Sequence, residues 1–60
     1  MGNRALKRRI ASIRQQIAEH ERKIAEERAL PHADAGLIKH WQVEIEAFQM
    51  SLERALKRLE

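Results

Sequence analysis

The chain has 60 residues, with 12 Lys and Arg against 9 Asp and Glu, no Cys, one Pro and two Gly. Such a chain holds one small domain at most, and domains below about 80 residues rarely bury enough apolar surface to be stable alone. The absence of Cys excludes disulfides, thiolate zinc ligands and cysteine nucleophiles. No apolar run approaches the roughly 18 residues of a membrane-spanning helix, and none follows the basic start as in a signal peptide, so we expect a cytoplasmic protein.

Helix-forming residues dominate the composition. Ala, Leu, Ile, Glu, Lys, Arg and Gln are abundant, whereas Val occurs once and Thr and Tyr are absent, so little is available for strands. At 43% hydrophobic and 35% charged residues, the chain is too apolar for a disordered tail. The composition therefore predicts an all-α fold.

The first predicted helix covers about residues 3–30, with Asn3 as its N-cap and no Pro or Gly inside. Its apolar residues follow the a/d spacing of a coiled-coil seam: Leu6, Ile10, Ile13, Ile17 and Ile24. Two polar residues, His20 and Glu27, fill the remaining d positions of this seam. One polar seam residue often fixes register or oligomeric state. If His20 is buried in its neutral form, assembly is expected to weaken below pH about 6.

A turn is predicted at about residues 31–36. Pro31 lacks the N–H that a continuing helix would use and disfavours helix in the residue before it. Asp34 is then a candidate cap for the second helix, with Gly36 in its first turn. In the alternative, Pro31 is itself the first helical residue and the turn is tighter.

The second predicted helix covers about residues 37–59. Its seam is complete: Ile38, Trp41, Ile45, Phe48, Leu52, Ala55 and Leu59, widened by Leu37 and Leu56. Two seams of equal length joined by a short turn predict an antiparallel hairpin. With the turn centred near residues 32 and 33, the expected neighbours are Ile24 with Trp41, His20 with Ile45, Ile17 with Phe48, Ile13 with Leu52 and Leu6 with Leu59. A single unbroken helix is the alternative, and Pro31 and Gly36 argue against it.

Small and apolar residues outside the seams suggest a second buried surface. They are the stripe Ala11, Ala18 and Ala25, which recurs every heptad, and the group Val43, Ala47 and Met50. Ala is also simply a good helix former, and scattered exposed apolar residues are normal. Because a single hairpin buries little, we expect these residues to form an oligomer interface in a homodimeric four-helix bundle. Larger oligomers and a partner protein are the alternatives.

Positive charge is concentrated toward the two ends of the sequence. An antiparallel hairpin brings these cations to one end, where they form a candidate polyanion-binding patch: Arg4, Lys7, Arg8, Arg9, Arg14, Arg54, Lys57 and Arg58. Nucleic acid, an acidic protein and an anionic membrane surface are all candidate ligands. The patch holds no aromatic side chains for base stacking. The alternatives are a solvated helix end and salt bridges between subunits.

Catalytic and metal-binding patterns are weak. His40 and Glu44 are four residues apart, but no Glu-x-x-His or His-Glu-x-x-His motif occurs. A serine nucleophile at Ser12 or Ser51 would need a base and a pocket, which an Ile and Leu core does not offer. We therefore expect no catalytic residue, no metal, no cofactor and no small-molecule substrate.

The sequence thus predicts a small non-enzymatic interaction protein, a homo-oligomeric hairpin that binds another macromolecule. The alternative is a nucleic-acid-binding regulator that uses the basic patch. In length and plan the chain resembles the dimeric RNA-binding hairpins of the repressor-of-primer kind. The resemblance covers the fold plan alone, shares no residue motif and assigns no functional residue.

Overall fold

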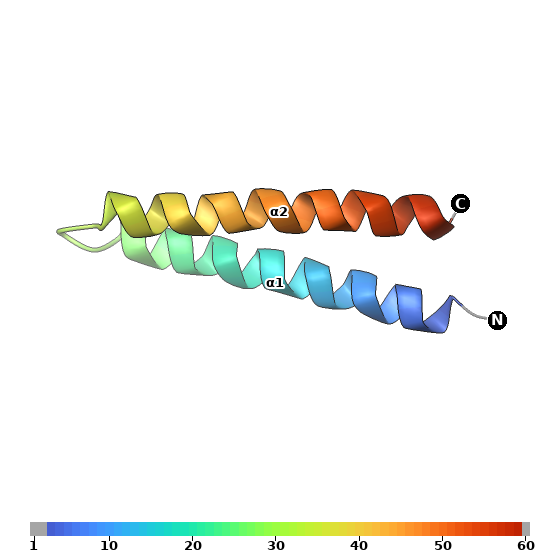
Figure 1. Ribbon diagram of the computed structural model, residues 1–60. Helices are drawn as coiled ribbons and strands as arrows, with labels where there is room; N and C mark the ends of the chain where they lie inside the picture. Colours follow the sequence, from blue (N-terminus) through green and yellow to red (C-terminus); the bar gives the residue numbers. More distant parts are fainter. Residues whose placement is uncertain (1–2, 60) are drawn as a thin grey trace.

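The computed structural model describes residues 3–59 as two α-helices, α1 (Arg4–Arg28) and α2 (Ala35–Leu59). The helices lie antiparallel in a rod of 51 × 14 × 12 Å, with the start of α1 and the end of α2 at the same end of the rod (Figure 1). The all-α hairpin is thus confirmed, and the single unbroken helix is wrong. Within residues 3–59, neither helix has a stretch apolar and long enough to cross a membrane.

The turn follows from how α1 ends. The N–H of Ala29 is shared between the carbonyls of Ala25 and Glu26, both at 3.2 Å, and the N–H of Leu30 donates to the carbonyl of Glu27 at 3.1 Å, so the last turn tightens before Pro31. Since Pro31 has no N–H to extend the ladder, α1 stops at Arg28, two residues before the predicted end.

The start of α2 is capped by Asp34, one of the two alternatives predicted for this turn. Asp34 Oδ1 accepts the N–H of Leu37 at 3.0 Å, and Glu27 Oε2 accepts the N–H of Asp34 at 3.0 Å. The helix therefore begins at Ala35, two residues before the predicted boundary, and Pro31 lies outside it. Asn3 stands at the N-cap of α1 as predicted, but its side chain makes no capping hydrogen bond.

The two seams pack against each other but remain incompletely covered. In α1 the buried residues are Ile10, Ile13, His20 and Ile24. In α2 only Ala55 is buried, and the other seam residues are half-buried: Ile38, Trp41, Ile45, Phe48, Leu52 and Leu59. Within residues 3–59 no large side chain is fully buried. Of the two residues predicted to widen this seam, Leu56 is half-buried and Leu37 is exposed.

The heptads also define two edges of the hairpin. In an antiparallel pair, the g positions of the two helices meet on one side of the seam and the e positions meet on the other. The g edge holds Arg9, Gln16, Lys23, Glu44, Ser51 and Arg58, and the e edge holds Lys7, Arg14, Glu21, Arg28, Gln42, Gln49 and Leu56. Residues of the two helices share cavities on each edge, which confirms the antiparallel alignment of the seams.

The caps give a first prediction. Asp34→Ala is expected to lower the free energy of unfolding by about 1 kcal/mol, because the N–H of Leu37 loses its acceptor. Urea denaturation at fixed protein concentration measures the change. Asn3→Ala is the matched control, since Asn3 makes no cap bond, and should leave stability within about 0.3 kcal/mol. Equal losses in the two variants would contradict this account of the caps.

Candidate functional site

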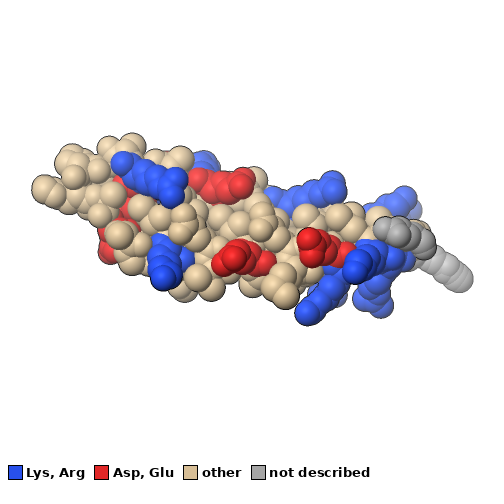
Figure 2. Space-filling view, turned by 90° about the horizontal axis from the view of Figure 1, so that it is seen from above, with Lys and Arg blue, Asp and Glu red and all other residues tan. Residues whose placement is uncertain are grey.

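The antiparallel fold gathers the predicted basic residues at the open end of the rod. The N-terminal half of α1 carries five of them and the C-terminal half of α2 carries three: Arg4, Lys7, Arg8, Arg9, Arg14, Arg54, Lys57 and Arg58. Every one of these side chains is exposed. Figure 2 shows blue side chains crowded at this end, with red ones toward the middle of the rod. We call this set the basic end.

The positive charges of the basic end are uncompensated within the described chain. Among residues 3–59, the ion pairs are those that Glu44 makes with His20 and His40, both distant from this end. Glu53 is the one acidic residue in the last two turns of α2 before Leu59, and it forms no ion pair with a described cation. The end therefore presents a local positive field greater than the net charge of +3 suggests.

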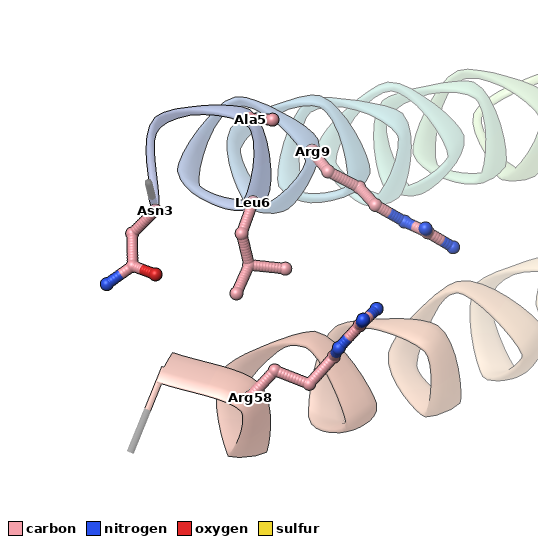
Figure 3. Close-up of a pocket in the computed structure, with 5 residues that line it drawn as sticks. All are labelled: Asn3, Ala5, Leu6, Arg9 and Arg58. Atoms are coloured by element: carbon pink, nitrogen blue, oxygen red, sulfur yellow. The ribbon is translucent and has the colours of Figure 1, made fainter. Parts of the chain in front are cut away.

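Two cavities lie between the helices at the basic end. The larger, about 430 Å³, is lined by Asn3, Ala5, Leu6, Arg9 and Arg58. Figure 3 shows the Arg9 side chain from α1 and the Arg58 side chain from α2 reaching into the same gap. The smaller cavity, about 130 Å³, shares Leu6, Arg9 and Arg58 and adds Ser51, Arg54 and Ala55. The basic end is thus hollowed on the g edge, with arginines on both sides.

A polar link crosses the middle of the hairpin. His20 Nε2 lies 2.9 Å from Glu44 Oε1, and His20 Nδ1 lies 2.9 Å from the carbonyl oxygen of Gln16. His40 Nε2 approaches the same oxygen of Glu44 at 3.5 Å. The carbonyl of Gln16 can only accept, so this contact needs a proton on His20 Nδ1. The contact with Glu44 needs a second proton, either on His20 Nε2 or on the carboxyl group.

The surroundings of His20 explain how a polar group occupies a seam position. Its ring packs edge-on against Phe48 at 5.2 Å between centroids, while its two nitrogens reach Gln16 and Glu44. The predicted neighbour Ile45 lies between Glu44 and Phe48 in the sequence, so the contacts agree with the expected register. The other polar seam residue, Glu27, stabilises the turn, because its carboxylate accepts a hydrogen bond from the N–H of Asp34. Whether His20 also selects the oligomeric state stays a prediction.

The six residues predicted to form an oligomer interface are all exposed: Ala11, Ala18, Ala25, Val43, Ala47 and Met50. At about 100° per residue, the Ala stripe adjoins the e edge of α1. The other group lies on the side of α2 that points away from α1, with Val43 54% and Met50 56% exposed. The structure therefore places the two groups on different faces of the hairpin, where one flat partner surface does not cover both.

Sequence reasoning missed three participants of the g edge. Glu44 binds the seam histidine, Ser51 lines the smaller cavity, and Lys23 places its Nζ 5.9 Å from the centre of the Trp41 ring. The signal that finds them is the heptad register itself, because Lys23, Glu44 and Ser51 all occupy g positions. Within residues 3–59, no group of three acidic or His side chains gathers as metal ligands.

The His20–Glu44 contact gives a second prediction. A double-mutant cycle with His20→Ala and Glu44→Ala is expected to show a coupling of about 1 kcal/mol, because the hydrogen bond crosses the seam but Glu44 keeps 42% of its side chain exposed. The control cycle pairs Glu44→Ala with His40→Ala. His40 is 64% exposed, so its coupling should stay below about 0.5 kcal/mol. Urea denaturation measures both, and equal couplings would refute the polar link.

Comparison with known proteins gives no relative from which a function can be carried over. No protein family, no curated protein and no solved structure matches this chain.

Proposed function

We propose that this chain is a non-enzymatic interaction protein: a hairpin that pairs with a second copy through its e edge and binds another macromolecule. The observation that carries the proposal is the incomplete core. A stable domain covers its large apolar side chains, whereas here six of the seven α2 seam residues keep part of their surface in water. A second hairpin supplies the missing contacts in a four-helix bundle.

The e edge is the side best suited to this contact. The a positions of α2, next to this edge, are Ile38, Ile45, Leu52 and Leu59, and all are half-buried. Leu56 continues this apolar surface at an e position. A groove of about 340 Å³ runs beside Ile24, Ala25 and Ile45 between the helices. Ile24 and Ile45 belong to the seam and Ala25 to the small-residue stripe, so a helix seated here buries both kinds of surface at once.

Charge at the rim is compatible with this pairing. Arg14 and Arg28 lie on the e edge of α1, and Glu46 and Glu53 lie one helical position beyond the e edge of α2. All four side chains are exposed in the hairpin. When α2 of the second copy packs against α1 of the first, these arginines and glutamates meet at the rim of the interface. This attraction favours packing of α2 on α1 over packing of α1 on α1 or of α2 on α2.

The third prediction tests the dimer and its face together. Light scattering coupled to size exclusion should give twice the 7.0 kDa chain mass at micromolar concentration. Leu56→Glu buries a carboxylate in the proposed interface and should abolish the dimer mass, whether or not the resulting monomer stays helical. Met50→Glu is the matched control on the far face of α2 and should leave the mass unchanged.

Two results would overturn this proposal. One is a wild-type mass of a single chain at micromolar concentration. The other is dissociation by Met50→Glu with Leu56→Glu still dimeric, which would assign the interface to the face of Val43, Ala47 and Met50.

The second candidate function is nucleic-acid binding by the basic end. It is favoured by eight exposed cations gathered on one end without a described ion pair. Phosphate backbones release condensed counterions when bound by such a cluster, so affinity depends steeply on salt. The cluster has no exposed aromatic platform, which favours contacts with the backbone rather than with bases.

The fourth prediction concerns this salt dependence. Binding of a fluorescent RNA or DNA of about 20 nucleotides, followed by anisotropy, should fall steeply between about 50 and 200 mM salt. Replacing Arg4, Lys7 and Lys57 together with Gln should lower the slope of log affinity against log salt by about 3, since each cation that binds a phosphate adds about 1 to that slope. Absence of binding at about 50 mM salt excludes this function.

A further inference from the structure

The smaller cavity of the basic end differs from the rest of the charged surface in its lining. Three arginines, Arg9, Arg54 and Arg58, line it together with Ser51. Arg54 and Arg58 lie one turn apart on α2, and Ser51 lies three residues before Arg54, so all three share one helix face. Arg9 comes from the opposite helix. In Figure 3, which draws the larger cavity, the side chains of Arg9 and Arg58 reach into the gap between the two helices, and both residues also line the smaller cavity.

This arrangement is unfavourable without a ligand. Like charges one helical turn apart destabilise a helix slightly, and Arg9 adds a third positive charge across the gap. Within residues 3–59 no carboxylate forms an ion pair with any of the three. Apolar side chains form the floor of the cavity, where Leu6 is half-buried and Ala55 is 4% exposed. An anion seated above this floor relieves the repulsion.

The size and chemistry of the cavity select the anion. Its volume of about 130 Å³ leaves room for a phosphate group. Guanidinium groups bind phosphate oxygens in pairs of parallel hydrogen bonds. The hydroxyl of Ser51 is a further donor for the same group.

We infer that Arg9, Arg54, Arg58 and Ser51 form a binding site for one phosphate group of a nucleic-acid backbone. The phosphate chemistry stands on the cavity, whereas the choice of a nucleic acid as its source rests on the second candidate function above. A membrane surface fits less well, because interfacial helices place apolar residues beside their cations. Among residues 3–59 the exposed large apolar side chains are Leu30, Leu37, Val43 and Met50. None of these four lies at the basic end.

The site also remains open in the proposed dimer. Arg9, Ser51 and Arg58 are g-edge residues, and the second hairpin is proposed to cover the e edge. Phosphate binding and dimerisation therefore use different sides of the molecule, and a variant of one surface leaves the other intact.

The first arm of the experiment uses inorganic phosphate. Titration of the whole chain at constant ionic strength, followed by nuclear magnetic resonance, should shift the Nε–Hε signals of the three arginines and the amide of Ser51. Chloride at equal ionic strength should not. Arg9→Gln should abolish these shifts, and Arg8→Gln, its neighbour on the outer side of α1, should retain them.

The second arm uses the fluorescent RNA or DNA of about 20 nucleotides. Arg9→Gln should weaken binding about tenfold, because it removes a charge-assisted pair of hydrogen bonds. Arg8→Gln, which removes the same charge from an adjacent position, should weaken it about threefold or less. Vesicles with about a quarter anionic lipid should bind more weakly than the nucleic acid at equal phosphate concentration.

The outcomes separate the site from the function. Equal effects of the two variants with no phosphate shifts overturn the site and leave nucleic-acid binding by the basic end standing. Phosphate shifts without nucleic-acid binding overturn the backbone as the source of the phosphate and the second candidate function with it. Tighter binding to the vesicles overturns the choice of nucleic acid.

Discussion

The geometry of a two-helix interface governs this molecule, because one helix covers only one side of its partner's seam. Along α1 the seam is narrow and most of it is buried: Ile10, Ile13 and Ile24 are each less than 10% exposed. Along α2 the apolar surface is broader, since Leu56 extends it, and α1 reaches only part of it. The shortage of cover therefore falls on α2. The proposed dimer follows from this asymmetry more than from the length of the chain.

The polar link between His20 and Glu44 adds a directional contact to a seam that is otherwise mostly apolar. A shift of one helix along the other breaks this hydrogen bond of 2.9 Å. The edge-on contact of His20 with Phe48 adds a second directional restraint at the same level. The link lies on the g edge, opposite the e edge on which the second hairpin is proposed to pack.

Much of the fold was predictable because periodicity and Pro31 are strong signals. The two seams and the antiparallel alignment follow from the residues alone, whereas the choice between Asp34 and Pro31 at the start of α2 is decided by the hydrogen bond that Asp34 accepts from Leu37. Asn3 shows the limit, since a capping residue type forms no bond unless its backbone angles direct the side chain to the N–H groups. The eight cations were also found, but not the cavity among them. Arg9, Ser51 and Arg58 converge only once the register of two helices is fixed, so no pattern within either helix reveals the cluster.

The helix dipoles sharpen the meaning of the basic end. Lys57 and Arg58 stand in the last turn of α2, where the helix dipole favours cations. Arg4 and Lys7 stand in the first turn of α1, which holds no acidic residue and no side-chain cap, and there cations oppose the dipole. Their placement works against the helix at a few tenths of a kcal/mol each. An anion bound at this end interacts favourably with both the cations and the N-terminus of α1, so binding reverses the penalty that folding incurs.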